Sequence, residues 1–403
     1  MPELSEVHGG VTAPAGFLAG ALHCGIKKSG DPDLAIIFSE KPATVAGVFT
    51  SNLVKAAPVL HSQKVVQGGA ARAIVANSGC ANAVTGEQGK LDAEAMARTV
   101  GECLGLSPYE VAVASTGTIG QRLPIERTVS GIKKLAPAVN RHGGEQAARA
   151  IMTTDTLPKS VAVRVPLSRG NIVIGGIAKG AGMICPELAT MLVFITTDAN
   201  VETPLLARAL DAAVQPSFNS ITVDGDSSTN DTVIVMANGA SNAAPIGDLS
   251  EDYFAFQAGL QHVCARLAEM LVRDGEGATK LVRIHVVGAV KRADAQKIAK
   301  TIANSLLVKT AIFGADANWG RIIAAAGRAG VEINPDIVDI QLGDILMLKA
   351  GAPQNFDEAR AKKLLTQKEV DITVDLHLGN ESATVLTCDL SYGYIKTNAA
   401  YRT

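Results

Sequence analysis

The segment KGAGMICPELATMLVFITTD spans residues 179–198, near the middle of the chain. Its first half is rich in glycine and runs into Cys185-Pro186, where a regular helix or strand cannot continue. Its second half, Thr190 to Thr196, is apolar and rich in β-branched residues, which predicts a buried strand. Thr190 therefore lies where a constrained loop meets a core strand, a position that suits a rigidly held nucleophile. Taken alone, the segment favours the simpler interpretation that Thr190 is only the first residue of a strand.

The composition is that of a large α/β protein. The chain has 403 residues, of which 47% are hydrophobic and 19% charged, enough for two domains or one two-lobed unit. Its 39 Gly residues fit a compact enzyme with many tight turns. The net charge of −2, the single Trp and the aromatic content of 4% argue against a nucleic-acid partner and against an anionic membrane surface.

The sequence lacks the usual marks of secretion, membrane insertion and metal binding. No apolar run reaches the ~18 residues that span a bilayer. The acidic start MPELSE lacks the basic and apolar regions of a signal peptide. The six Cys residues are widely scattered, which excludes CxxC motifs and favours reduced thiols. We therefore expect a cytoplasmic protein with neither a metal nor a cofactor.

Strands and helices are predicted to alternate on both sides of the central segment. Residues 161–165 and 171–174 predict a β-hairpin before it, and residues 204–214 predict a helix after it. A polar run at 222–231 precedes a predicted strand at 232–236. The three Asp residues of this run lack the spacing of a calcium-binding loop, so a solvated or substrate-facing turn is the better interpretation.

The N-terminal part contains two polar segments that could serve a site. Strands are predicted at 35–38, 44–49, 73–76 and 111–114, and helices at 90–104, 124–139 and 144–153. The segment NSGCAN at 77–82 is expected to form a turn, either an ordinary one or one whose amides face a ligand. The segment STGTIG at 115–120 is expected to form a loop whose N–H groups could make an oxyanion hole, although Gly is common in any tight turn.

The C-terminal part begins with the clearest helical pattern of the chain, at 250–272. The glycine-containing segment RDGEGATK follows at 273–280 and places Glu276 just past the helix end. A strand is predicted at 281–287 and a helix at 293–306; beyond Trp319, a predicted packing anchor, the remainder is expected to be strand-like. A lone Gly180-x-Gly182 lacks the third glycine of a dinucleotide site, and no HExxH or GxSxG motif occurs.

Several ordered motifs together resemble one family, the ornithine acetyltransferases, also called glutamate N-acetyltransferases. They comprise 179–192, 54–58, 77–79, 115–117, 153–155, 224–226, 274–277, 313–316, 318–321 and Asn398. The resemblance implies a mixed-sheet, layered α/β fold of the self-cleaving type, with two lobes. The segment departs from the commoner form HPNMAT at Cys185, Glu187 and Leu188. These positions precede the expected cleavage point, so we expect them to affect the cleavage rate more than the acetyl transfer.

The resemblance also implies self-processing. Thr190 would attack the carbonyl of Ala189, and the resulting ester would hydrolyse. An α-chain of residues 1–189 and a β-chain of residues 190–403 would then stay together, with two copies of each. The new terminal Thr190 carries a hydroxyl and an α-amine of pKa ~8 on one residue. That amine can take the hydroxyl proton near neutral pH, as in other N-terminal threonine nucleophiles.

By the same resemblance, Thr116 and Gly117 would form the oxyanion hole. The positions that match substrate-binding residues are Thr153, Lys179, Thr190, Glu276, Asn398 and Thr403. Lys179 could pair with an α-carboxylate, and Glu276 with the cationic amine of ornithine. Thr154 is an alternative to Thr153, and without the resemblance Lys179 and Glu276 would be taken as surface charges.

The expected reaction is a ping-pong acetyl transfer from N2-acetylornithine to Thr190 and then to glutamate, in arginine biosynthesis. Whether acetyl-CoA is a second acetyl donor stays open. An amidase or aminopeptidase with the same nucleophile is the alternative within this chemistry. A non-catalytic amino-acid-binding protein is the alternative from another class, and the cleavable Ala189-Thr190 bond argues against it.

Overall fold

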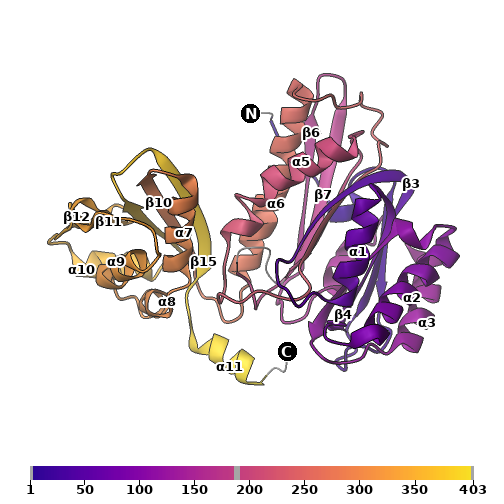
Figure 1. The fold of residues 1–403 in the computed structure, drawn as a ribbon, viewed down its shortest axis with the longest axis horizontal. Coiled ribbons are helices and arrows are strands. Elements are labelled where there is room, and N and C mark those ends of the chain that lie inside the picture. The colour runs from indigo at the N-terminus through magenta and orange to yellow at the C-terminus, as the bar shows by residue number, and fades with distance from the viewer. Residues whose placement is uncertain (1–2, 186–190, 401–403) are drawn as a thin grey trace.

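The computed structural model describes residues 3–185 and 191–400, and these form two lobes of mixed α/β structure (Figure 1). The first lobe is built on a nine-stranded sheet of order β1-β6-β7-β8-β9-β3-β4-β5, with β2 paired to β3. The pairs β4–β5 and β8–β9 are parallel and the others antiparallel. The strands are β1 Ser5–Glu6, β2 Phe17–Leu22, β3 Leu34–Phe49, β4 Ala70–Cys80, β5 Val111–Thr118, β6 Lys159–Pro166, β7 Asn171–Lys179, β8 Leu192–Thr197 and β9 Thr232–Ala237.

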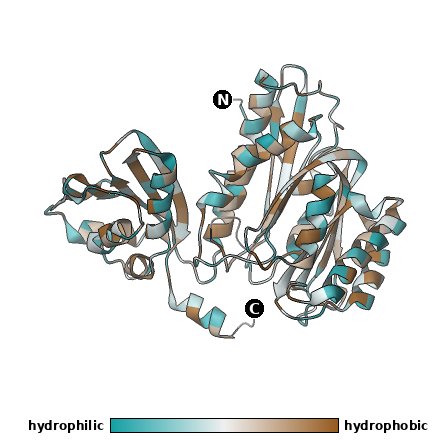
Figure 2. Cartoon of the chain, in the orientation of Figure 1, coloured by the Kyte–Doolittle hydropathy of each residue, from teal (hydrophilic) through white to brown (hydrophobic). Residues whose placement is uncertain are grey.

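Helices cover this sheet and close its core. Every residue of β8 and β9 is buried, as expected for central strands covered on both faces. One apolar cluster joins α2 and α3 to strands β3 to β5, and another joins α5 and α6 to strands β6 to β9. Figure 2 shows the apolar residues concentrated along the strands. The helices are α1 Ala57–Gln67, α2 Gly86–Leu104, α3 Ile125–Leu135, α4 Gly144–Ala150, α5 Thr203–Val214 and α6 Glu251–Arg273.

The second lobe has its own six-stranded sheet of order β13-β12-β11-β14-β10-β15, with its own apolar cluster. Helix α7 packs on β10 and β15. The strands are β10 Leu281–Ala289, β11 Asp339–Leu342, β12 Ile345–Lys349, β13 Ala352–Pro353, β14 Glu369–Asp375 and β15 Glu381–Cys388, and the helices are α7 Arg292–Ala303, α8 Leu306–Phe313, α9 Trp319–Gly327 and α10 Glu358–Leu365.

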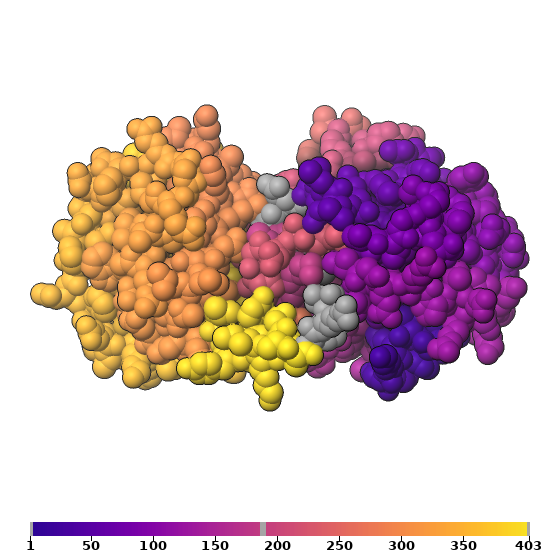
Figure 3. Space-filling view, turned by 60° about the horizontal axis from the view of Figure 1, so that its bottom comes forward, coloured from indigo at the N-terminus to yellow at the C-terminus, as the bar shows by residue number. Residues whose placement is uncertain are grey.

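The last helix, α11 (Tyr392–Ala400), leaves the second lobe and returns toward the first (Figure 1). Ser391 Oγ donates a hydrogen bond of 2.5 Å to the carbonyl of Gly277, next to the junction of the lobes. Gly277 has a φ of 68°, and a Cβ there would lie 2.1 Å from the backbone nitrogen of Tyr394. A residue without a side chain is therefore needed at this crossing. Figure 3 shows α11 at the edge of a hollow between the two lobes.

The structure confirms the predicted two-lobed α/β architecture and most of its elements. The hairpin β6–β7, the strands β8, β9 and β10, and the helices α5, α6 and α7 lie where the sequence patterns place them. The lobes divide between α6 and β10, at residues 274–280. The expected chain division at 189/190 falls elsewhere, between the antiparallel neighbours β7 and β8 of one sheet. Among the described residues, no helix combines the length and the hydropathy needed to cross a membrane.

Other expectations are wrong in detail. The strands predicted at 35–38 and 44–49 are one strand, β3, with a register shift between Phe38 and Ala43. The expected turn at 77–82 and the expected loop at 115–120 begin as extensions of β4 and β5, because these two strands continue to pair in parallel as far as Cys80 and Thr118. The helix predicted at 124–139 becomes a 3-10 turn at 136–138, where Pro137 interrupts it.

The expectation that the chain beyond Trp319 is strand-like is also wrong, because α9, α10 and α11 lie there. Side chains that accept hydrogen bonds from the first helical turn start two of these helices. Asn318 accepts from the N–H of Arg321, and Asp357 accepts from the N–H of Arg360. Such capping stabilises helices too short to show a clear apolar period.

A buried ion cluster joins the parts of the first lobe near its junction with the second. Lys159 Nζ, on a side chain only 1% exposed, lies 2.6 Å from Asp155 and 2.6 Å from Asp274. Asp155 also accepts a hydrogen bond of 2.6 Å from the N–H of Gly180. The cluster thereby connects the start of β6, the end of β7 and the end of α6.

We expect Lys159→Met to lower the free energy of unfolding by ~3–5 kcal/mol, because it leaves two carboxylates without their buried cation. Denaturant unfolding of both proteins measures the difference. Lys90→Met is the control, since Lys90 pairs with Glu87 at the surface, where such a pair contributes at most about 1 kcal/mol. Equal losses for the two variants would contradict a structural role for the cluster.

Candidate active site

A cavity of about 170 Å³ lies where β5, β7 and the end of α6 meet α11. We call it the central cavity. Six of the predicted site residues line it, namely Thr116, Gly117, Thr153, Lys179, Glu276 and Asn398. Thr154 lines it as well, so the choice between Thr153 and Thr154 stays open. The predicted residues Ala189, Thr190 and Thr403 lie outside the described residues, as do Glu187 and Leu188.

The end of β5 brings Thr116 and Gly117 to the cavity. Gly117 has a φ of 130°, and a Cβ there would lie 2.3 Å from the carbonyl carbon of Gly79 on β4. Only glycine therefore allows β4 and β5 to come this close while Gly117 has this backbone conformation. Asn77, expected in a turn that could face a ligand, is instead buried within β4 and accepts a hydrogen bond of 2.6 Å from Ser115 Oγ.

The end of β7 brings in Lys179, which is only 2% exposed. The alternative that Lys179 is a surface charge is therefore wrong. Its Nζ lies 3.2 Å from Thr116 Oγ1. Burial lowers the pKa of Lys179, and the nearby carboxylate of Asp155 acts in the opposite direction. An anion bound in the cavity would favour the charged form of this lysine.

Asp155 belongs both to the buried ion cluster and to the surroundings of Lys179. Burial acts to raise the pKa of Asp155, but Lys179 and Lys159 outweigh burial, and the pKa falls to about 2. The carboxylate is thus ionised at neutral pH and holds a hydrogen bond of 3.0 Å from the N–H of Thr153. Asp155 thereby fixes the segment that carries Thr153.

Glu276 supplies a negative charge to the central cavity. Asn398 Nδ2, on α11, donates a hydrogen bond of 2.7 Å to Glu276 Oε2. A Cβ at Gly182 would lie 2.5 Å from the same oxygen, so glycine at 182 leaves room for the carboxylate. The cavity therefore has a lysine from β7 and a carboxylate from the junction of the lobes among its lining groups.

Asp224, from the polar run, holds the loop that follows β7. Its carboxylate accepts hydrogen bonds of 2.6 Å from the N–H of Met183 and 2.9 Å from the N–H of Ile184. Tyr394 on α11 donates a further bond of 3.3 Å to it. Asp224 and Tyr394 both line the cavity, so this run faces the cavity. The sequence patterns gave no sign of Tyr394, because they did not predict α11.

Two later residues of this run, Asn230 and Asp231, connect β5 and the residue after β4 to the start of β8. Asn230 Nδ2 donates to the carbonyls of Ala81 (2.6 Å) and Ser115 (2.9 Å). Asp231 Oδ1 accepts a bond of 2.9 Å from the N–H of Met191, and the N–H of Thr232 donates a bond of 3.1 Å to the Met191 carbonyl. Both backbone groups of Met191, the residue after Thr190 in the sequence, are thus held.

Asp231 is a completely buried carboxyl, and its Oδ2 has no hydrogen-bond partner within the described part of the chain. Burial raises the pKa of Asp231 well above its usual value. The neutral form of this group is therefore favoured.

No cluster of three or more His, Cys, Asp or Glu side chains that could hold a metal occurs in residues 3–185 or 191–400.

Comparisons with known proteins agree with the motifs. The ArgJ family model matches residues 18–403. The arginine biosynthesis bifunctional protein ArgJ of Symbiobacterium thermophilum is 51% identical over 397 residues, which cover 98% of this chain and 99% of that one. The protein of the same name from Geobacter sulfurreducens is 50% identical over 389 residues, covering 96% and 99%.

A solved structure supports the same assignment. The crystal structure of arginine biosynthesis bifunctional protein ArgJ from Bacillus halodurans aligns with 46% identity and a TM-score of 0.50, covering 51% of this chain and 97% of that chain. The family match over nearly the whole length and the relatives near 50% identity agree with the motifs at 115–117, 179–192 and 274–277. The chain belongs to the ArgJ family, the acetyltransferases of arginine biosynthesis.

Proposed function

We propose that the protein transfers acetyl from N2-acetylornithine to glutamate through an acetyl ester on Thr190, giving ornithine and N-acetylglutamate. The observation that carries this proposal is the central cavity, which has Lys179, Glu276 and the pair Thr116 and Gly117 among its lining residues. An amino acid with an α-carboxylate and a cationic side chain offers one partner to each charged group. The oxyanion-hole role of Thr116 and Gly117 is then served by groups already fixed in β5.

We further propose that the chain matures by cleavage between Ala189 and Thr190. The two products would share one sheet, because β7 and β8 pair over six residues on either side of the cleavage segment. They would therefore stay together without a covalent link. The Bacillus halodurans chain gives support from its size, since 97% of it covers only 51% of this chain. Two copies of each product would make the α2β2 assembly that the family resemblance implies.

The proposed chemistry uses the α-amine that cleavage would free on Thr190. The amine takes the hydroxyl proton while Thr190 attacks the acetyl carbonyl, and it returns the proton to the leaving ornithine amine. The α-amine of glutamate then attacks the ester carbonyl, and the bond from the acetyl carbon to the Thr190 oxygen breaks. The Thr190 α-amine takes the proton that the glutamate amine loses and returns it to the Thr190 oxygen, and N-acetylglutamate leaves. Lys179 would bind the α-carboxylate of each substrate in turn, and Glu276 with Asn398 would bind the side-chain amine of ornithine. Thr153 and Thr403 would complete the binding of the substrate.

We expect Thr190→Ala to remain one uncut polypeptide without transferase activity, because both the attacking hydroxyl and the later nucleophile are gone. Denaturing mass spectrometry and an acetyl-transfer assay test this, with the cleaved parent protein as the positive control. Efficient cutting of Thr190→Ala at the same bond would exclude self-catalysis. In the cleaved parent protein, release of acetate from N2-acetylornithine with no transfer to glutamate would favour the amidase alternative.

Glu276→Gln should weaken ornithine and N2-acetylornithine more than glutamate, because glutamate has no side-chain amine. Loss of a charge-assisted pair costs ~1.5–3 kcal/mol, or roughly ten- to a hundredfold in affinity. Lys179→Met should instead weaken both substrates, since both carry an α-carboxylate. Steady-state kinetics on variants confirmed to be cleaved measure this. An equal rise in KM for glutamate and N2-acetylornithine in Glu276→Gln would show that Glu276 does not bind the amine.

The hydrogen bond from Met191 to Asp231 predicts a role in maturation. Asp231→Ala removes the acceptor that holds the backbone beside the scissile bond, and we expect cleavage to slow by roughly tenfold or more. Asp231→Asn keeps an acceptor and resembles a neutral carboxyl, so it should cleave much faster than Asp231→Ala. A time course of fragment appearance by mass spectrometry compares them. The same rate in all three proteins would contradict this role.

A further inference from the structure

The two substrates of the proposed reaction differ in the charge of their side chains, and the central cavity suits only one of these charges. N2-acetylornithine carries a side-chain cation, whereas glutamate carries a second carboxylate. Lys179 is the only cation among the described residues that line the cavity, and the proposed reaction uses it for the α-carboxylate. Three lining residues carry carboxyl groups, namely Asp224, Asp226 and Glu276. These groups would repel the γ-carboxylate of glutamate, which therefore needs a cation elsewhere.

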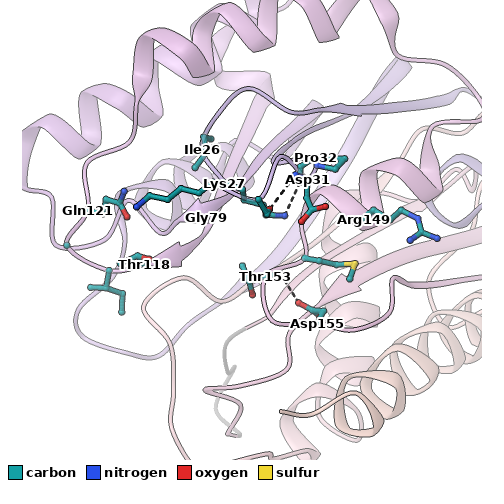
Figure 4. Close-up of a pocket in the computed structure, with 15 residues that line it drawn as sticks. Ile26, Lys27, Asp31, Pro32, Gly79, Thr118, Gln121, Arg149, Thr153 and Asp155 are labelled. Atoms are coloured by element: carbon teal, nitrogen blue, oxygen red, sulfur yellow. Dashed lines mark hydrogen bonds between the residues drawn. The ribbon is translucent and has the colours of Figure 1, made fainter. Parts of the chain in front are cut away.

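Cations lie around a second cavity, which adjoins the central cavity because Ile119 and Thr153 line both. We call it the outer cavity, and its volume is about 980 Å³. Figure 4 shows Lys27, Gly79 and Thr153 among the residues that line it. Three basic residues contribute to this lining, namely Lys27, Lys28 and Arg149. The positive charge that glutamate needs is therefore present just beyond the wall that the two cavities share.

Lys27 is closely connected to the groups proposed to act in the reaction. A Cβ at Gly79 would lie 3.2 Å from the side chain of Lys27, so this side chain packs on β4. Gly79 is in turn the register partner of Gly117, which belongs to the proposed oxyanion hole. Burial lowers the pKa of Lys27, and Asp155 and Lys179 are among the charged groups that also act on it. These charges act on Lys27 because its ammonium group lies near both.

Lys27 is also fixed in place and free to bind an anion. The buried carboxylate of Asp33 accepts a hydrogen bond of 3.0 Å from the N–H of Lys27, which holds its backbone. Its Nζ donates a hydrogen bond of 2.9 Å to the carbonyl of Pro32, and an ammonium group has further N–H donors for a ligand. Within residues 3–185 and 191–400, Lys27 forms no ion pair. Arg149, in contrast, already pairs with Glu145 on α4.

We propose that Lys27 binds the γ-carboxylate of the acceptor glutamate where the outer cavity meets the central cavity, while Lys179 binds the α-carboxylate. This inference rests on the proposed function, because it assigns a further binding group to the second half of the same reaction. The two substrates then share the contact with Lys179, and their side chains diverge, that of ornithine toward Glu276 and that of glutamate toward Lys27. Attraction at one position and repulsion at the other make each side chain select its own position.

The test compares glutamate with glutamine, which has a neutral amide in place of the γ-carboxylate. In the cleaved parent protein, kcat/KM for transfer from N2-acetylornithine should be about a hundredfold or more higher with glutamate. Lys27→Met keeps the apolar stem that packs on Gly79 but removes the charge, so this preference should fall about tenfold or more. Lys27→Arg keeps a cation and should retain most of the preference. Lys28→Met removes the neighbouring charge in the same cavity and, as the matched control, should change it less than about twofold.

Single-turnover release of ornithine from N2-acetylornithine, measured without an acceptor, separates the two halves of the reaction. Lys27→Met should slow this release much less than it slows transfer to glutamate. Absence of transfer to glutamate in the parent protein would count against the proposed function. If the parent transfers acetyl to glutamate, three results would each overturn only the assignment of Lys27: no preference over glutamine in the parent, an unchanged preference in Lys27→Met, or an equal slowing of both halves. An equal loss of preference in Lys28→Met would overturn it as well.

Discussion

The hydrogen bonds made by residues 230–232 are the constraint on which the geometry of the site depends. Asn230 holds the carbonyls of Ala81 and Ser115, while Asp231 and Thr232 hold both backbone groups of Met191. One short segment therefore sets the distance between the end of β5 and the start of β8. Acyl transfer requires the nucleophile and the oxyanion donors to be placed with sub-ångström precision. A carboxyl buried at this point costs stability unless it is neutral, which fits the raised pKa of Asp231.

The rest of the architecture brings charged groups from distant parts of the chain to this frame. Lys179 comes from the end of β7, Glu276 from the junction of the lobes, and Asn398 from the last helix. The close crossing of Gly277 and Tyr394 fixes α11 against the junction, so Asn398 can reach Glu276. The second lobe thus contributes to the site mainly by returning the chain to it. The apolar core of the second lobe holds β15, the strand from which the chain runs to α11.

The sequence predicted best what local patterns control. Long apolar periods identified α6, α7 and β8 to β10, and the motifs identified six residues that the structure gathers in one cavity. Patterns failed where tertiary pairing extends a strand through polar residues, as at Asn77 and Ser115, which bond to each other inside the sheet. They also failed for α11, whose place depends on one backbone crossing at Gly277. The burial of Lys179 could not be read from composition, because its cost is offset by Asp155 from another loop.

The charges around the site have a consistent order from the interior outward. Asp155 lies between Lys159 and Lys179, and its low pKa keeps it ionised at neutral pH. One of its oxygens pairs with Lys159, and that lysine also pairs with Asp274, so the buried charges nearly balance. Lys179 is the member of this group that lines the central cavity, and burial makes its charged form costly until an anion arrives. Buried ion pairing thus leaves Lys179 facing the cavity, and Glu276 supplies the opposite charge to the same cavity.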